Sequence, residues 1–257
     1  MRENPVKRAL AAGAAPVGTM VCEFLTANVP RLVRSAGADF VLYDLEHSGF
    51  GIERLRELLP ATNATGVVPL VRVPDAVYDS ISRALDLGAL GVMIPACESA
   101  DEARLLVESA RFPPAGRRGF GLLYSDTWEP EGLPATMAKA NEETLLLVQI
   151  ETAAGLEAVE EIAAVDGVDV LWIGGYDLTA SLGVAGEFEA PPFLAAVERI
   201  VAAARAAGKH VGMVCTSVEE GLLMRSRGLS ILGYSFDTWI YESALRAGIE
   251  SLRASGP

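Results

Sequence analysis

The sequence predicts a (β/α)8 barrel, and three observations support this fold class. Short apolar runs alternate with helical patterns along the 257 residues, which indicates strands paired in parallel. The runs lack regular polar alternation, as is typical of strands covered on both faces. Eight such runs in about 250 residues favour a closed barrel over an open doubly wound sheet. No G-x-G-x-x-G motif follows the first run, so the usual dinucleotide signature of an open sheet is missing.

Each expected strand is a short apolar run that stops at a polar residue, a glycine or a proline. The strands are expected at residues 17–22, 40–44, 67–72, 91–94, 145–150, 168–173, 210–214 and 229–235. Runs of this length between turn residues are consistent with buried strands.

The segments between the runs carry helical spacing. Ile52, Leu55 and Leu58 repeat at three-residue intervals, and Ser99 and Glu102 have the spacing of a capping box. Helices are expected at residues 29–36, 52–61, 78–87, 99–111, 156–164, 176–182, 192–207, 218–227 and 239–254. Residues 112–141, which are richer in Pro, Gly and aromatic residues, form an expected insertion that serves as a lid or a subunit contact. We therefore expect one barrel domain over residues 1–257.

The charge balance narrows the partners. A net charge of −13 with only three lysines argues against nucleic acid and against an anionic membrane surface. No apolar run approaches the roughly 20 residues that a membrane helix needs, and no secretory signal is visible. Cys22, Cys97 and Cys215 are scattered without metal-type spacing, so reduced thiols in a cytoplasmic protein are expected.

Polar residues collect where the expected strands end, and in such barrels those ends form the active site. They include Cys22, Glu23, Asp44, Glu46, His47, Arg72, Gln149, Glu151, Gly174, Gly175, Asp177, Ser235 and Asp237. The barrel therefore brings a histidine, an arginine and several carboxylates onto one face from distant parts of the chain.

Glu151 and Asp177 follow neighbouring strands. Two carboxylates in this arrangement can hold a hard divalent cation, with water and substrate oxygens completing the coordination. The alternative is that each residue only caps the helix that follows it.

Arg72 and His47 each have a functional and a structural interpretation. Arg72 stands among apolar residues and prolines, so it is either a clamp on a carboxylate or developing oxyanion, or an internal salt bridge to Glu46 or Glu151. His47 has Asp44 three residues before it, which could orient its imidazole for proton transfer. His210 begins a strand and belongs to the opposite face, where we expect a structural role.

Gly174 and Gly175 leave backbone N–H groups at the start of a helix, which suits a small carboxylate, although a tight turn explains them equally well. Lys7, Lys139 and Lys209 are all expected away from the upper rim of the barrel. No lysine is therefore expected where Schiff-base catalysis would need one. If the barrel activates a carbonyl, a metal is the expected electrophile.

These motifs together resemble the HpcH/HpaI aldolase family of metal-dependent class II pyruvate aldolases, over roughly residues 10–250. In chain order they are Asp44-x-Glu46-His47, Val71-Arg72-Val73-Pro74, Gly91-Val-Met-Ile-Pro95, Arg118-Gly-x-Gly121, Gln149-Ile-Glu151 and Ile173-Gly-x-x-Asp177-Leu-x-x-Ser181-x-Gly183. The family includes 4-hydroxy-2-oxoheptanedioate and 2-dehydro-3-deoxyglucarate aldolases. The resemblance implies a barrel of the phosphoenolpyruvate/pyruvate type and reversible retro-aldol cleavage of a 4-hydroxy-2-oxo acid to pyruvate and an aldehyde, through a metal-stabilised pyruvate enolate.

The resemblance also implies a metal site and a pyruvate site. Glu151 and Asp177 would hold Mg²⁺, Mn²⁺ or Co²⁺, which pyruvate would chelate through its keto and carboxylate oxygens. The pyruvate carboxylate would lie near the backbone of Gly174, Gly175 and Tyr176.

The implied catalytic groups come from the second and third strands. Arg72 would stabilise the enolate oxygen, with Gln149 close to it. His47, paired with Asp44, would transfer protons together with a water. The family also implies a homo-oligomer, often a hexamer, with the C-terminal helix in a subunit interface.

The chain departs from the family pattern mainly on the aldehyde side. The residues before the metal aspartate are Gly174-Gly-Tyr176, and Tyr176 could narrow the carboxylate site. A tryptophan common at the end of the first strand is replaced by Met20, Val21 or Cys22. Two alternative functions are a CoA-ester lyase of the citrate-lyase type, against which the scarcity of lysine speaks, and a non-catalytic barrel that senses a keto acid.

Overall fold

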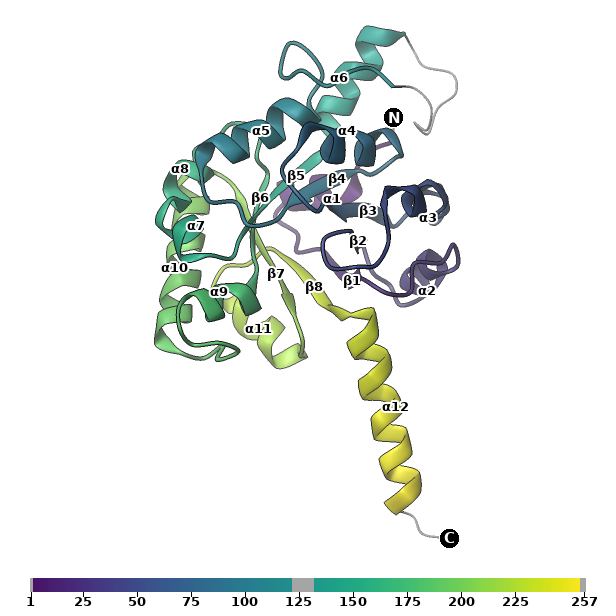
Figure 1. Cartoon of the computed structure of the whole chain (residues 1–257), viewed down its shortest axis with the longest axis vertical. Helices are drawn as coiled ribbons and strands as arrows, with labels where there is room; N and C mark the ends of the chain where they lie inside the picture. The colour runs from purple at the N-terminus through teal and green to yellow at the C-terminus, as the bar shows by residue number, and fades with distance from the viewer. Residues whose placement is uncertain (1, 122–131, 255–257) are drawn as a thin grey trace.

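The computed structural model describes residues 2–121 and 132–254, and it confirms the closed barrel. Parallel strands β1 to β8 pair in chain order, and β8 returns to β1 (Figure 1). The strands are β1 (Val17–Val21), β2 (Phe40–Asp44), β3 (Val68–Arg72), β4 (Gly91–Ile94), β5 (Leu145–Ile150), β6 (Val170–Ile173), β7 (His210–Cys215) and β8 (Ile231–Phe236). Each strand lies within two residues of its predicted bounds at either end.

Most of the helices surround the barrel. The helices are α1 (Pro5–Ala11), α2 (Val29–Ser35), α3 (Leu55–Asn63), α4 (Tyr78–Asp86), α5 (Ala100–Ala110), α6 (Leu133–Glu143), α7 (Ala153–Glu157), α8 (Val159–Ala163), α9 (Gly175–Ser181), α10 (Pro191–Ala206), α11 (Val218–Ser226) and α12 (Asp237–Ala254), with a 3₁₀ turn η1 (Ile52–Arg54) before α3. Ser99 and Glu102 form the predicted capping box of α5. The expected helix at 156–164 is two short helices, α7 and α8, and part of the expected insertion is the helix α6.

The sequence analysis missed α1, although its start carries the usual signals. Asn4 caps the helix by accepting the Lys7 N–H, and Pro5 occupies the first helical position. Val6 and Leu10 pack against the side chains that fill the barrel from below. The helix therefore closes the amino-terminal end of the barrel.

Two apolar layers hold the barrel together. Inside it, side chains such as Phe40, Leu70 and Leu147 fill the core, and the rings of Phe40 and Trp172 meet edge to face at 6.5 Å. A larger layer packs between the outer face of the sheet and the helices. Because both faces of most strands are covered, the strands read as nearly continuous apolar runs. The exception is β8, where Tyr234 is exposed because α12 does not pack on the sheet.

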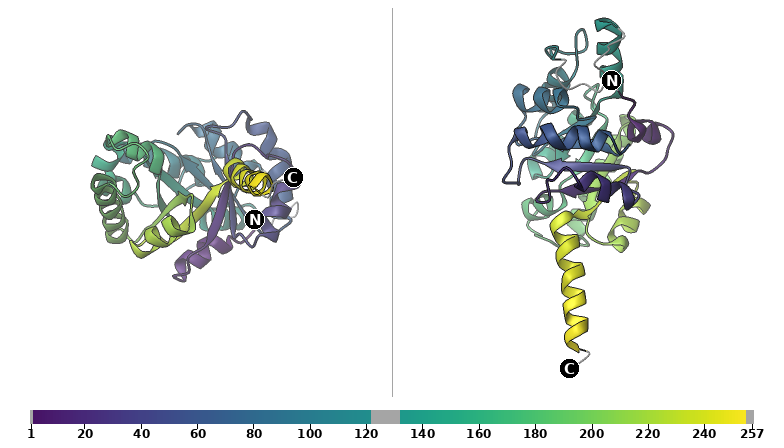
Figure 2. Two further views of the ribbon diagram at one scale, coloured as in Figure 1. Left: turned by 90° about the horizontal axis from the view of Figure 1, so that it is seen from below. Right: turned by 90° about the vertical axis from the view of Figure 1, so that its right-hand side faces the viewer.

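The C-terminal helix α12 differs from all the others, because it projects away from the barrel (Figures 1 and 2). The structure describes every residue of α12, and none of them is buried. Its root is fixed, since the carboxylate of Asp237 accepts the backbone N–H groups of Cys22, Glu23 and Phe24. Among the residues that the structure describes, no helix is long and apolar enough to cross a membrane.

Candidate active site

Asp44 and Arg72 end adjacent strands, and the parallel register places them side by side. Nε and Nη2 of Arg72 donate to the two carboxylate oxygens of Asp44, each at 2.9 Å. Asp44 is fully buried and Arg72 is 6% exposed. A buried two-point ion pair of this kind fixes the plane of the guanidinium group. The remaining nitrogen, Nη1, lies 3.4 Å from Oε1 of Gln149 and faces the barrel mouth with it.

This pairing corrects the expectation that Asp44 orients the imidazole of His47. Asp44 accepts the backbone N–H groups of Glu46 and His47, so it shapes the loop after β2. The His47 imidazole instead lies 3.7 Å from the Glu46 carboxylate, and its side chain is 65% exposed at the rim. The carboxylate that accompanies the imidazole is therefore Glu46. The sequence does contain a signal for the Asp44–Arg72 pair, because a carboxylate and an arginine stand at the matching ends of two adjacent strands.

Glu46 has an incompletely satisfied carboxylate. Its Oε2 is buried and lies 2.9 Å from Nη1 of Arg72 and 3.7 Å from Nε2 of His47, but it accepts no hydrogen bond from the described residues. The salt bridge between Arg72 and Glu46 is one of the two that the structural interpretation of Arg72 predicted. Partial burial raises the pKa of Glu46 above its ordinary value, while the positive charge of Arg72 opposes that rise.

Glu151 is a buried carboxylate held from several sides. Its Oε1 accepts the Ala96 N–H at 2.7 Å, and its Oε2 accepts from the Gln149 amide. Ala96 holds a left-handed backbone conformation (φ 43°), a strained geometry for alanine that aims its N–H group at Glu151. Burial raises the pKa of Glu151 to about 7, and the charges of Glu46 and Asp177 add to the rise. The Ala96 N–H and Arg72 favour the charged form.

Helix capping does not explain Glu151 or Asp177. Thr152 caps α7 by accepting the Gly155 N–H, so Glu151 is not the cap. Asp177 lies inside the first turn of α9, which has Gly174 at its N-cap, and its exposed side chain lines the same cavity as Arg72. Gly174 permits the close approach of β5 and β6, because an added Cβ would collide with the carboxylate of Glu151.

A cavity of about 280 Å³ opens at the carboxyl ends of the strands. It is lined by Met20, Cys22, Leu42, Asp44, His47, Arg72, Met93, Gln149, Trp172, Ile173, Gly174, Gly175, Tyr176, Asp177, Val214, Phe236 and Trp239. All the predicted catalytic and substrate-binding residues are thus in its lining. Glu151 reaches it through its contacts with Gln149 and Gly174.

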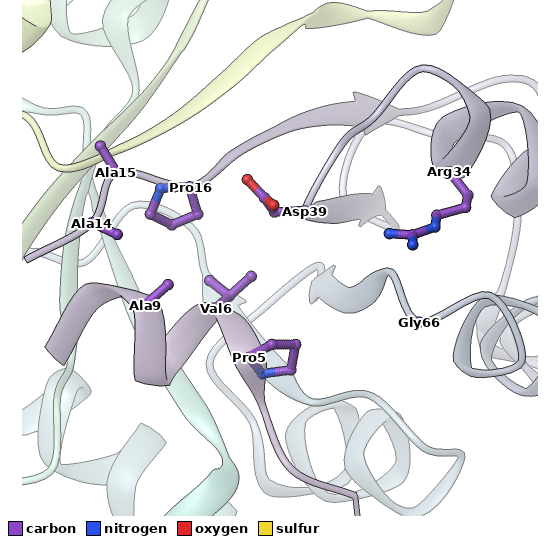
Figure 3. A pocket seen from close by; sticks show the side chains of 9 residues that line it. All are labelled: Pro5, Val6, Ala9, Ala14, Ala15, Pro16, Arg34, Asp39 and Gly66. Carbon is purple, nitrogen blue, oxygen red and sulfur yellow. The ribbon is translucent and has the colours of Figure 1, made fainter. Parts of the chain in front are cut away.

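A second cavity, also of about 280 Å³, lies at the other end of the barrel beside α1. Figure 3 shows its lining, where Asp39 lies between the alanine side chains and Arg34. The Asp39 carboxylate there accepts the Val17 N–H at 2.8 Å and so ties β1 to β2. The position of this cavity at the amino-terminal face of the barrel indicates a role in stability. His210, also at that end, lies 3.3 Å from the hydroxyl of Ser230.

One side of the main cavity is aromatic, which the sequence analysis did not anticipate. The rings of Tyr176 and Trp239 meet edge to face at 5.5 Å, and Phe236 contacts Trp239 at 4.8 Å. Phe188 supports Tyr176 from behind at 4.9 Å. We call Tyr176, Phe236 and Trp239 the aromatic wall. Its members come from α9, β8 and α12, so no local spacing in the sequence connects them.

The donor set suits a hard divalent cation with few protein ligands. Among the described residues, no three acidic, histidine or cysteine side chains group tightly enough to form a complete protein metal site. Mg²⁺ commonly uses one or two carboxylates and takes its other ligands from water and substrate. The buried Glu151 and the cavity-lining Asp177, whose charges interact, fit that pattern.

The fold and the groups at its carboxyl end define a (β/α)8-barrel enzyme, and comparisons with known proteins specify its kind. The family described as HpcH/HpaI aldolase/citrate lyase matches residues 23–244. The chain belongs to this family. Both activities in the family's name cleave or form carbon–carbon bonds, which confirms the predicted enzyme class.

Individual relatives agree with this assignment. The chain is 32% identical over 252 residues to a hydroxypyruvate/pyruvate aldolase of Roseovarius nubinhibens, covering 97% of both chains. It is 31% identical over 242 residues to a 2-keto-3-deoxy-L-rhamnonate aldolase of Escherichia coli O157:H7, covering 94% of this chain and 90% of the relative. The crystal structure of an HpcH/HpaI aldolase from Desulfitobacterium hafniense DCB-2 superposes with a TM-score of 0.93, at 30% identity and 96% coverage of both chains.

Proposed function

We propose that this protein is a metal-dependent class II aldolase that reversibly cleaves a 4-hydroxy-2-oxo acid to pyruvate and an aldehyde. The observation that carries the proposal is the buried Glu151 carboxylate, held by the Ala96 N–H and the Gln149 amide beside the cavity that Arg72 and Asp177 line. The names of the aldolase relatives support the reaction class.

Glu151 and Asp177 would hold Mg²⁺, Mn²⁺ or Co²⁺, and Gln149 would fix the Glu151 carboxylate. The bound ion would act as a Lewis acid on the keto oxygen of the substrate and so supply the electron sink that a lysine supplies elsewhere. Gly174 and Gly175 admit the substrate carboxylate beside α9, where Tyr176 borders it.

Arg72 and His47 would perform the remaining steps. Arg72, which lines the cavity, would stabilise through Nη1 the negative charge that develops on the keto oxygen as the carbon–carbon bond breaks. Asp44 keeps the guanidinium in that orientation. His47, acting through a water at the open rim, removes the proton of the 4-hydroxyl group and returns a proton to the methyl carbon of the product. Glu46 supports the imidazole.

We further propose a cytoplasmic homo-oligomer, such as a hexamer, in which α12 lies in a subunit interface. The free thiols of Cys22, Cys97 and Cys215 suit a reducing compartment. The exposed helix α12 suits a subunit contact.

The exchange of pyruvate methyl protons with D2O tests the proposal without knowledge of the aldehyde. We expect NMR to show exchange with Mg²⁺ or Mn²⁺, no exchange with EDTA, and no exchange in Glu151→Gln. Exchange that persists in EDTA would contradict the metal-dependent mechanism. Binding of pyruvate and metal without exchange would instead indicate a keto-acid sensor.

The family's name also covers citrate lyases, so a CoA-ester lyase is the second candidate. Such an enzyme needs basic residues for the CoA phosphates, and a net charge of −13 with three lysines disfavours it. A thermal shift with acetyl-CoA distinguishes the two, since an aldolase is not stabilised by this ligand.

A further inference from the structure

The aromatic wall gives one side of the active-site cavity a surface made mostly of ring carbon atoms. Phe236 carries no polar side-chain atom, and Val214, a half-buried residue of β7, continues the same apolar surface. The Tyr176 hydroxyl interacts with the side chain of Thr216, which does not line the cavity. Tyr176 therefore presents mainly its ring, and Trp239 meets that ring edge to face.

Most polar groups of the cavity lie on other elements, and Asp177, which shares α9 with Tyr176, would hold the metal. His47 lies at the rim, after β2. Asp44 and Arg72 end β2 and β3 and are engaged with each other, and Gln149 on β5 is engaged with Arg72 and Glu151. These groups serve the pyruvate half of the substrate in the proposed reaction. The aromatic wall stands on α9, β8 and α12, so it is left for the other half.

We infer that the aldehyde half of the substrate is apolar, and that Trp239 and Tyr176 select it against hydroxylated aldehydes. The inference rests on the proposed aldolase function and names the substrate class of the same site. An aldehyde hydroxyl packed against the aromatic wall would give up its hydrogen bonds to water without a replacement. An alkyl or aryl chain would instead bury its surface against the aromatic rings.

The reaction itself is ordinary aldol chemistry and needs no further reactant. A methyl C–H bond of pyruvate breaks, and that carbon forms a bond with the aldehyde carbonyl carbon. One proton leaves the methyl group and one proton is added to the new hydroxyl oxygen, so atoms and charge balance. Only the surroundings of the aldehyde's remaining chain differ between an apolar and a hydroxylated substrate.

Propanal and glycolaldehyde form a matched pair, since one has a methyl group where the other has a hydroxyl. With pyruvate and Mn²⁺, we expect kcat/KM of the full-length protein to be about 10- to 100-fold higher for propanal, which is the discrimination that apolar pockets achieve. In Trp239→Ala and Trp239→Asn the ratio should fall toward one. The ratio is independent of the fraction of protein that folds, because both aldehydes are measured on one preparation.

Leu222→Ala is the control, because it removes an exposed apolar side chain of α11 outside the cavity lining. It should keep the wild-type ratio. A wild-type ratio of one or below, or an unchanged ratio in both Trp239 variants, overturns the inference. If the wild-type protein exchanges pyruvate protons in D2O but shows no preference, the aldolase function stands and the aldehyde inference alone is wrong. If it shows no exchange, both are wrong.

Discussion

Asp44 and Arg72 occupy the same register position at the ends of β2 and β3, and two hydrogen bonds of 2.9 Å join their side chains. Of the active-site contacts, this buried pair is the one that the sequence analysis assigned to the wrong partner. It also supports the proposed role of Arg72, because a guanidinium held at two points cannot rotate away from the substrate.

Arg72→Lys should lower the rate of pyruvate proton exchange by about 10²- to 10³-fold, the usual effect of losing an oxyanion donor. A lysine cannot bridge both oxygens of Asp44 and reach the cavity at the same time. Arg72→Ala should also lose about 3–5 kcal/mol of unfolding free energy, because Asp44 stays buried without its partner. NMR exchange and urea unfolding measure the two effects.

Arg118→Lys is the matched control, since Arg118 is equally buried and pairs with Asp86 outside the active-site cavity. It should lose stability and keep its exchange rate. Equal losses of activity in the two lysine variants would contradict a specific role for Arg72.

Gly174→Ala should weaken Mn²⁺ binding by about 10- to 100-fold, as expected when the orientation of a metal ligand is disturbed. The added Cβ would collide with the Glu151 carboxylate and lie 2.7 Å from Nε2 of Gln149. Titration calorimetry measures the affinity.

In the control Gly221→Ala, the nearest atoms to the new Cβ are at 3.7 and 3.8 Å, so Mn²⁺ binding should persist and α11 should gain about 0.5–1 kcal/mol of stability. Unchanged Mn²⁺ affinity in Gly174→Ala would place the metal elsewhere.

Acidification should destabilise the amino-terminal end of the barrel through His210. Burial lowers the pKa of His210 below its ordinary value of 6.5, while Asp169 opposes this, and Asp169 is itself paired with Lys7 and Arg111. Above pH 6.5 the imidazole is neutral in both states, so the full stability is present. Below pH 6.5 the unfolded chain binds the proton first, and stability falls by at most about 1.4 kcal/mol per pH unit until the folded protein also binds it.

Urea unfolding of wild type and His210→Gln at pH 7.5 and 5.5 tests this linkage. The glutamine variant should lose less stability between the two pH values, because it lacks the titrating group. Equal losses in the two proteins would show that carboxylates alone set the acid dependence.

The helix α12 should be an oligomerisation element. Tyr241, Leu245 and Ile249 are exposed and repeat every four residues, which forms an apolar stripe along one side of the helix. An isolated helix of this length is marginal in water, so contact with another subunit would stabilise it.

Leu245→Glu combined with Ile249→Glu should convert the oligomer to a smaller species in analytical ultracentrifugation. Ser251→Glu, on another side of α12, is the control and should leave the mass unchanged. A wild-type monomer at micromolar concentration would contradict this role.

Much of the fold could be predicted from the sequence, because the parallel barrel buries both faces of most of its strands. The apolar run from Phe40 to Asp44 predicted its strand, and Ser99 with Glu102 predicted the start of a helix. The carboxyl ends of parallel strands share one rim, so the order of strand ends alone predicted that residues as distant as His47 and Asp177 line one cavity.

Tertiary structure alone decided how those side chains pair. Asp44 lies close to His47 in sequence but bonds to Arg72, because the register between β2 and β3 sets which side chains meet. The Ala96 N–H reaches Glu151 only through a backbone conformation that no sequence pattern announces. Tyr176, Phe236 and Trp239 meet only when β8 closes against β1 and α12 leaves the rim. Periodicity reports which face of an element is buried, whereas the geometry of the closed barrel determines which residues share a site.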